Sequence, residues 1–241
     1  MSVASAVAAA EALFGESAET EDFVNWSDWA LARFGFRPSN CLPLVALCRD
    51  ELMASVEDAI EATWGHAFQV GSLAGIVLAG RTGLQAALGH VPGEDGRHRF
   101  AAFCLPHIGI DAHGQVGRVV RRGMHRDSSA CGALVGAGQA LERTWGHLAH
   151  DPDDFEMSAL CSRLAMEVGE QAVPGLDRLT ELTRRAAVAD LRRYIGLVAA
   201  DEPIDVAYLS GIVVHLPDGS DRIAGVHGEV VIDGVSHALP H

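Results

Sequence analysis

Two cysteines and one histidine stand where the sequence pattern predicts that the ends of strands and helices converge. Cys48 follows LPLVAL, a short apolar run typical of a buried strand, and Cys131 opens CGALVGAGQAL, a pattern typical of a helix. His107 lies inside a further strand pattern, FAAFCLPHIGID. Two thiolates and a neutral imidazole leave Zn²⁺ nearly neutral and keep one tetrahedral position open, as in catalytic zinc sites. The other interpretation is two inert buried cysteines and a core histidine.

Asp50 comes two residues after Cys48, at the junction between the predicted strand and the helix that follows it. In open α/β sheets, ligands bind at such junctions because the carboxyl ends of strands and the N-termini of helices converge there. A carboxylate at that place can serve a metal site, and it can equally cap the first turn of the helix. Both interpretations of Asp50 stay open on the residues alone.

Two other sets of residues could carry chemistry. Cys131 with His107 as its base would form the nucleophile pair of a cysteine hydrolase, since a helix N-terminus and an imidazole both lower the pKa of a thiol. His107, Asp111 and His113 share one strand face by parity and could hold a metal, but Gly114 makes His113 a turn residue. The remaining cysteines are expected to pack in the core: Cys41, Cys104 and Cys161.

These candidates need strands and helices to position them, and the pattern predicts one α/β domain over residues 1–241. GIVLAGRT, within 71–89, is close to a phosphate-loop motif but has Arg81 in place of lysine, and its small residues favour a tightly packed buried helix. RFAAFCLPHIGID predicts a strand that Gly114 turns into its hairpin partner, QVGRVV. The other expected elements are an N-terminal helical segment at 1–35, helices at 155–170 and 176–200, and a C-terminal β-hairpin at 204–237.

The composition excludes several classes of function. All 18 basic residues are arginines, so the chain has no lysine for a Schiff base or for a standard phosphate loop. Against 32 acidic residues they leave a formal charge of −14, which opposes binding to a phosphate backbone, and we expect no nucleic-acid partner. One basic cluster remains, and we interpret it as a solvated strand edge or loop: Arg118, Arg121, Arg122, His125 and Arg126.

The sequence shows no pattern typical of a targeting or membrane segment. The apolar stretch SVASAVAAAEALF has no basic residue before it and is interrupted by Glu11, unlike a signal peptide. The longer apolar stretch 71–90 contains Arg81 and five glycines, so we expect no membrane association. Five irregularly spaced cysteines indicate metal ligation, catalysis or burial rather than disulfides. We therefore expect a cytoplasmic protein.

Four motifs together resemble the limiting-CO2-inducible protein B/C family, also called theta-type carbonic anhydrases. The motifs are, in chain order, CRDEL at 48–52, GSLAGIVLAGRTG at 71–83, PHIGIDAHG at 106–114 and SACGAL at 129–134. The resemblance implies an α/β fold like that of beta-carbonic anhydrases, with a central sheet flanked by helices, usually in a homodimer. It also implies a Zn²⁺ cofactor bound by Cys48, His107 and Cys131, acting on CO2 and bicarbonate.

The resemblance further implies an aspartate–arginine pair beside the zinc. Asp50 keeps the C-x-D spacing that beta-type enzymes use, and Arg49 is the best match to the arginine. Beta-type enzymes space the motif C-x-D-x-R, but Leu52 stands at the last position, so Arg81 is an alternative partner. The pair would keep Asp50 ionised and turned away from the metal.

The implied function is the zinc-dependent, reversible hydration of CO2 to bicarbonate, because zinc lowers the pKa of bound water toward about 7 and so creates hydroxide at neutral pH. Two alternatives stay open: a non-catalytic zinc- or bicarbonate-binding scaffold of the same fold, and the cysteine hydrolase described above. A small apolar pocket for CO2 is expected, with walls from Leu73, Ile76 or Phe103. The candidate proton shuttles are His66, His90, His98, His113 and His125.

Overall fold

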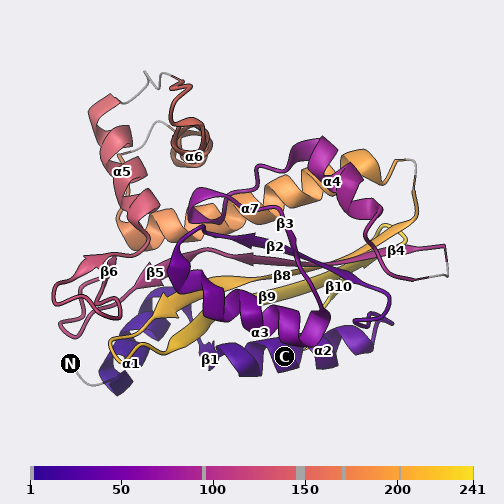
Figure 1. Cartoon of the computed structure of the whole chain (residues 1–241), viewed down its shortest axis with the longest axis horizontal. Helices are drawn as coiled ribbons and strands as arrows, with labels where there is room; N and C mark the ends of the chain where they lie inside the picture. The colour runs from indigo at the N-terminus through magenta and orange to yellow at the C-terminus, as the bar shows by residue number, and fades with distance from the viewer. Residues whose placement is uncertain (1–2, 94–95, 145–149, 170–171, 201, 241) are drawn as a thin grey trace.

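The computed structural model describes residues 3–93, 96–144, 150–169, 172–200 and 202–240, and Figure 1 shows their arrangement. The helices are α1 (Val3–Phe14), α2 (Thr20–Ala32), α3 (Ala54–Trp64), α4 (Gly80–Leu88), α5 (Gly132–Thr144), α6 (Phe155–Val168) and α7 (Leu176–Val198), with short 3-10 turns η1 (Glu51–Met53) and η2 (Leu73–Gly75). The strands are β1 (Ser17–Glu19), β2 (Leu42–Leu47), β3 (Phe68–Gln69), β4 (His98–Leu105), β5 (His107–Gly109), β6 (Arg118–Val119), β7 (Ser128–Ser129), β8 (Ile204–His215), β9 (Asp221–Ile232) and β10 (Val235–Ala238). The helices predicted at 155–170 and 176–200 correspond to α6 and α7, and the N-terminal helical segment consists of α1 and α2 with β1 between them.

One mixed sheet organises the chain. Its strand order is β1-β9-β8-β4-β2-β3, with β10 paired to β9 and β5 paired to β8. Strands β3, β2, β4 and β8 run parallel, whereas β9 is antiparallel to β8, β1 and β10. All six residues of β2 are buried, as expected for a parallel strand that is covered on both faces. The predicted α/β fold with a central sheet flanked by helices is confirmed.

Helices cover both faces of this sheet (Figure 1). Val45 of β2 points to one face, where it joins the core cluster that contains Ile60 of α3. Its neighbour Leu44 points to the other face and clusters with Leu84 of α4 and Leu191 of α7, because successive strand residues alternate between faces. Helix α5 lies beyond one end of the sheet and packs against α6 and α7.

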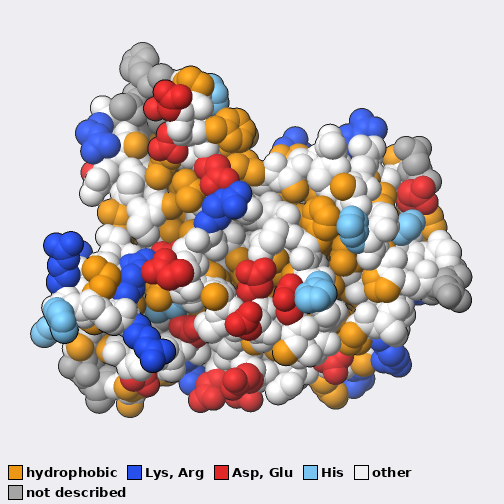
Figure 2. All heavy atoms as spheres, viewed as in Figure 1, with side chains coloured by type: hydrophobic (Ala, Val, Ile, Leu, Met, Phe, Trp, Pro, Cys, Tyr) orange, Lys and Arg blue, Asp and Glu red, His pale blue; other side chains and the backbone are white. Residues whose placement is uncertain are grey.

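The helices α2 and α3 present acidic side chains to solvent. Acidic side chains gather on the visible face over α2 and α3 (Figure 2), and both helices carry exposed carboxylates, among them Glu21 of α2 and Asp58 of α3. Among the helices of the described residues, none combines the length and the apolar character that crossing a membrane requires.

The C-terminal hairpin is present, but its first strand lies in the middle of the sheet. β8 pairs in parallel with β4 on one side and antiparallel with β9 on the other, so it is not a peripheral addition. The strand VAYLSGIVVHL is apolar at almost every position because both of its faces are buried. The local pattern identified the hairpin, whereas its central place depends on pairing with a strand about a hundred residues earlier.

The prediction of one buried helix over 71–89 is wrong in its first half. Only Gly80–Leu88 is helical, as α4, and it is amphipathic rather than buried: Leu84 and Ala87 face the core while Arg81 is exposed. Residues 71–79 form the turn η2 and a bridge between Gly71 and Val77. The segment cannot continue the helix because its backbone has positive φ at Ala74 and at Gly75.

The strand predicted around His107 is divided at Pro106 into β4, which pairs with β2 and β8, and β5, which pairs with β8 alone. The predicted hairpin survives only as a bridge between Ile110 and Val116 around the turn at 112–113. Arg118 and Val119 pair instead with Ser129 and Ser128, in the small sheet β6-β7. The loop between these two strands contains Arg121, which belongs to the site described next.

Candidate metal centre

Cys48, His107 and Cys131, the ligands that the family resemblance implies, lie together at one buried point. Their ligand atoms all lie within 4.8 Å of one another. The two sulfur atoms are 3.7 Å apart. Two sulfurs bound to one tetrahedral zinc at about 2.3 Å each would be separated by about 3.8 Å. The spacing of this pair therefore suits a shared metal ion, and among the described residues no other group of histidine, cysteine or acidic side chains is arranged in this way.

The topology brings these three residues together at one edge of the sheet. Cys48 directly follows the last residue of β2, and His107 opens β5 just beyond the end of β4. β2 and β4 are parallel and end side by side, with Leu47 opposite Leu105. Cys131 directly precedes α5, whose N-terminus points at the same edge. Carboxyl ends of parallel strands and helix N-termini converge in this way in open α/β sheets.

The loop 71–76 closes over Cys48. The backbone N–H of Ala74 donates a hydrogen bond to the Cys48 sulfur at 3.1 Å. Gly71 makes this approach possible, because a Cβ there would lie 2.5 Å from the carbonyl oxygen of Leu47. The motif GSLAG therefore holds a ligand sulfur in place instead of forming a helix.

The two thiols are joined by a hydrogen bond that shifts their pKa values in opposite directions. A hydrogen bond from the Cys131 thiol lowers the pKa of Cys48 to about 4, and the neighbouring His107 adds to this effect while burial opposes it. The hydrogen bond to Cys48, together with burial, raises the pKa of Cys131. A metal ion that binds both sulfurs must displace the proton of this hydrogen bond, so binding is coupled to proton release.

His107 has one ring nitrogen engaged and one free. Its Nδ1 lies 2.8 Å from Nε2 of His215, and Nδ1 of His215 lies 2.6 Å from Oδ1 of Asp221. Burial lowers the pKa of His215 below its usual value, although Asp221 works in the opposite direction. The Nε2 atom of His107 is buried and has no hydrogen-bond partner among the described residues. A free buried nitrogen beside two sulfurs is what a metal ligand needs, so the residues fit a zinc ion.

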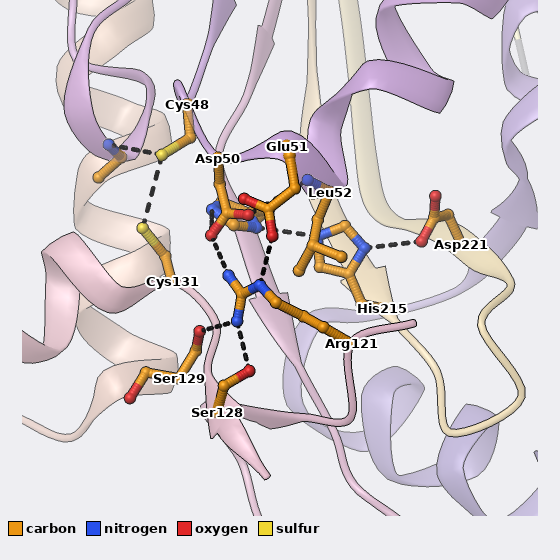
Figure 3. A network of polar contacts seen from close by, with 12 residues as sticks. Cys48, Asp50, Glu51, Leu52, Arg121, Ser128, Ser129, Cys131, His215 and Asp221 are labelled. Carbon is orange, nitrogen blue, oxygen red and sulfur yellow. Dashed lines mark hydrogen bonds and ion pairs between the residues drawn. The ribbon is translucent and has the colours of Figure 1, made fainter. Parts of the chain in front are cut away.

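Asp50 caps the 3-10 turn η1 and binds an arginine at the same time. Its Oδ1 accepts the backbone N–H of Leu52 at 3.1 Å, as predicted for a helix cap. Its Oδ2 accepts from Nη2 of Arg121 at 2.6 Å and lies 4.0 Å from Nε2 of His107. Arg121 also binds Glu51 at 2.6 Å and the carbonyl of Ser129 at 2.8 Å (Figure 3). Both oxygens of the carboxylate are therefore oriented by the protein.

The expected arginine partners of Asp50 lie elsewhere. Arg49 points away and forms an ion pair with Glu156 of α6 at 2.7 Å, with 63% of its side chain exposed. Arg81 is exposed on α4. The pairing of Asp50 with Arg49 or Arg81 is corrected to Arg121, which lies in the loop between β6 and β7 and contacts both Asp50 and Glu51 just after β2.

Three residues of the site escaped the sequence analysis. Arg121 belongs to the basic cluster that was interpreted as a solvated edge, and a concentration of positive charge in a chain of net charge −14 was the signal that could have identified it. His215 and Asp221 flank the turn of the C-terminal hairpin, and nothing in their spacing connects them with His107.

Other expected positions are not part of this arrangement. Phe103 packs against Phe23 and Trp64 in the core, whereas the cavity of about 450 Å³ beside Cys48 and Asp50 is lined by neither Leu73, Ile76 nor Phe103. His113 lies in the turn at 112–113, and its backbone N–H donates to Asp111 at 2.8 Å. Within the described part of the chain, none of the proposed shuttle histidines hydrogen-bonds to the three ligands: His66, His90, His98, His113 and His125. Cys41, Cys104 and Cys161 are buried, as expected.

Comparison with protein families and with solved structures points to the same family of proteins. A family model described as limiting CO2-inducible proteins B/C beta carbonic anhydrases matches residues 17–231. The crystal structure of PtLCIB4, a homolog of the limiting CO2-inducible protein LCIB, is 25% identical with a TM-score of 0.82, over 97% of this chain and 99% of that one. The crystal structure of LCIB is 27% identical with a TM-score of 0.76, over 95% and 96% of the two chains. The comparison with curated proteins gives no match.

Proposed function

Because this chain belongs to the limiting CO2-inducible protein B/C family of beta-carbonic anhydrases, we propose that it catalyses the reversible hydration of CO2 to bicarbonate with one zinc ion held by Cys48, His107 and Cys131. The observation that carries the proposal is the buried cluster of two sulfurs 3.7 Å apart beside the free Nε2 of His107. Three protein ligands leave a fourth tetrahedral position for water or substrate, as in catalytic zinc sites.

The charges of the site suit this reaction. Zinc, when bound, lowers the pKa of a coordinated water toward about 7 and so supplies a strong nucleophile at neutral pH. The thiolates of Cys48 and Cys131 balance the charge of the metal, so the site does not attract anions strongly and can release bicarbonate. His107 adds no charge because it binds as a neutral imidazole.

Asp50 orients the attacking water in this proposal. Its Oδ2 lies 4.0 Å from Nε2 of His107. The carboxylate is therefore close enough to the predicted ligands to contact a water molecule bound at the metal. Arg121 and the N–H of Leu52 hold the carboxylate in one orientation, in which it could accept an O–H from a water at the metal and so orient that water toward CO2. The ion pair with Arg121 also keeps Asp50 ionised and restrains it from binding the metal itself.

Substrate can approach from the side of β2 and α3. A cavity of about 450 Å³ reaches Cys48 and Asp50 and is lined also by Leu47, Met53, Ala54 and Gly71. CO2 carries no charge, so apolar walls such as Leu47 and Met53 suit it better than ionic groups. Glu51 and Glu57 line the same cavity, so its wall carries polar groups beside the apolar ones.

Two alternatives make different predictions. In a scaffold of the same fold, the protein binds zinc and does not hydrate CO2. In a cysteine hydrolase, Cys131 is the nucleophile, but its pKa is raised by burial and by Cys48, and only 2% of its surface is exposed. The geometry therefore favours the metal over the nucleophile.

Metal analysis combined with stopped-flow CO2 hydration tests the proposal. We expect one zinc per chain, and zinc content should fall sharply in Cys48→Ser, His107→Ala and Cys131→Ser. Cys161→Ala is the matched control, because this buried cysteine of α6 lies outside the cluster and its replacement should leave zinc in place. A triple ligand variant that keeps stoichiometric zinc would show that the ligand set is wrong, and a zinc-loaded parent without hydration activity would favour the scaffold.

The assembly and the compartment follow as further parts of the proposal. We expect a homodimer, since large apolar side chains are exposed near both ends of the chain, among them Leu13, Trp29 and Val235. Light scattering should give twice the chain mass of 25.5 kDa, and a monomer mass over a wide concentration range would contradict this. The buried, unpaired cysteines suit a reducing compartment such as the cytoplasm.

A further inference from the structure

We propose that His215 and Asp221 are positioning residues that fix the tautomer and the orientation of His107, so that its Nε2 carries a lone pair toward the metal. The inference rests on the proposed function, because it treats His107 as a metal ligand. It concerns two residues of the C-terminal hairpin that play no part in the ligand set or in the pair formed by Asp50 and Arg121.

Three adjacent strands place these residues in one row. His107 opens β5, His215 ends β8 and Asp221 begins β9. β5 and β8 are paired in parallel with His107 opposite Val213, so His215 lies diagonally across from His107 on the same face. His215 is directly opposite Asp221 in the antiparallel pair. The row is set by backbone pairing, which makes its geometry rigid.

When His215 is neutral, the distances fit one distribution of protons along the row. The carboxylate of Asp221 only accepts, so Nδ1 of His215, at 2.6 Å, carries the proton of that bond. A neutral imidazole has a single N–H, so Nε2 of His215 presents a lone pair. Nδ1 of His107, at 2.8 Å, must then donate to it. The remaining nitrogen of His107, Nε2, is left without a proton.

Burial reinforces this order of protons. His107 is completely buried and His215 is 3% exposed, so water cannot replace a missing partner. In the reversed tautomer of His107, two lone pairs would face each other between the rings and an N–H would point at the position of the metal. The rings meet edge to face, with centroids 5.0 Å apart and planes at 75°, which also restrains rotation of His107.

The outer end of the row is anchored as well. Oδ2 of Asp221 accepts a hydrogen bond from the hydroxyl of Ser55 on α3 at 2.7 Å, so both carboxylate oxygens are held. Figure 3 shows His215 between Asp221 and the site, with Arg121 approaching from another segment of the chain. Asp50 is thus oriented by one network and His107 by a second one.

Two pairs of variants test the inference. His215→Leu removes the acceptor for His107, whereas His215→Gln keeps an acceptor oxygen on a side chain of similar reach. Asp221→Ala frees His215 to reverse its tautomer, whereas Asp221→Asn keeps an oxygen that can accept from it. His90→Leu, at an exposed histidine beyond α4, is the control for loss of a histidine. Zinc affinity is measured by competition with a chelator, and long-range ¹H–¹⁵N NMR of the metal-free proteins shows which nitrogen of His107 carries the proton.

We expect the Nδ1–H tautomer of His107 in the parent. Zinc should bind about 10- to 100-fold more weakly in His215→Leu and Asp221→Ala, as for other losses of a ligand's hydrogen-bond partner, with Nε2–H appearing in the spectrum. His215→Gln, Asp221→Asn and His90→Leu should stay within about threefold of the parent, a margin well below that loss. The parent spectrum alone tests the inference if His215→Leu does not fold.

Three results would overturn the inference: an Nε2–H tautomer in the metal-free parent, a His215→Leu protein that binds zinc as tightly as the parent, or a parent that binds no zinc. A different result would refute only the proposed activity. A parent that shows the Nδ1–H tautomer, binds zinc and loses affinity in His215→Leu, but does not hydrate CO2, would support the positioning role in a non-catalytic scaffold.

Discussion

Replacing Arg121 by alanine should strongly lower the rate of CO2 hydration while leaving the zinc in place. Arg121 is the only described arginine that binds Asp50, at 2.6 Å, and the two side chains are 18% and 11% exposed. Without it, Asp50 keeps only its bond to the N–H of Leu52 and is free to turn toward the metal. None of the three predicted ligands contacts Arg121 through a hydrogen bond or an ion pair, so metal content should not change.

The size of the effect follows from the contacts that are lost. Losing one preorganised contact in the transition state costs on the order of 10²-fold in rate, which corresponds to about 2.7 kcal/mol of activation free energy. The free energy of unfolding should fall by about 1.5–3 kcal/mol, as expected for a largely buried hydrogen bond between charged groups. The bond from Arg121 to Glu51 adds little, because the Glu51 side chain is 71% exposed.

The assay is stopped-flow CO2 hydration on proteins of measured zinc content. Arg121→Lys should recover only part of the rate, since an ammonium keeps the charge but cannot bind Asp50 and the carbonyl of Ser129 through one planar group. Arg122→Ala is the matched control, because this neighbouring arginine is exposed. The reasoning would be refuted by a zinc-loaded Arg121→Ala protein with the parent rate, and an inactive Arg49→Ala beside it would return the role to Arg49.

Three further changes test other parts of the structure. Asp50→Asn should keep the fold, the cap and the zinc but lower hydration by on the order of 10²-fold; an unchanged rate would reduce Asp50 to a helix cap. Gly71→Ala should lower the free energy of unfolding by about 1–3 kcal/mol, because its Cβ would lie 2.5 Å from a backbone oxygen. Gly196→Ala in α7 should instead raise thermal stability, because there is open space around that position. Equal melting temperatures for the two variants would contradict this reasoning. The hydrogen bond from Arg192 lowers the pKa of Glu229, so this ion pair stabilises the protein above the unfolded pKa of Glu229 and is lost as the pH falls through the lower, folded value. Glu229→Gln should therefore melt earlier than the parent at pH 7 and lose less stability on acidification, as measured by thermal unfolding between pH 7 and 3.

The positions of the three predicted ligands were accessible from local patterns. Cys48 follows an apolar run typical of a buried strand, and Cys131 precedes an apolar pattern of helical period. Asp50 stands where a cap is expected, and the structure shows that it is one. These features depend on a few neighbouring residues, whereas the grouping of the three residues into one ligand set came from the resemblance of the four motifs to a known family.

The irregular segment 71–79 shows where local patterns fail. Its small apolar residues are compatible with a helix, and what excludes the helix is the contact of Gly71 with Leu47 and the positive φ of Ala74 and Gly75. The hydrogen bond from the Ala74 N–H to the Cys48 sulfur also stabilises the backbone of this segment. The deviation from the local pattern thus lies at the candidate site, where tertiary contacts override propensity.

The sequence by itself determined the α/β class, the strand ends and helix starts, and the residue types that suit zinc. Only the tertiary structure decided which distant side chains orient Asp50 and His107. Asp50 and Arg121 are 71 positions apart, and His107 and His215 are 108 positions apart. Such pairs form because β8 pairs beside β4 and because the loop between β6 and β7 brings Arg121 to the turn after β2, so both depend on contacts between distant segments. Hydrophobic periodicity specifies what an element is and which face it buries, but it carries no information on which distant polar side chain will meet another across that core.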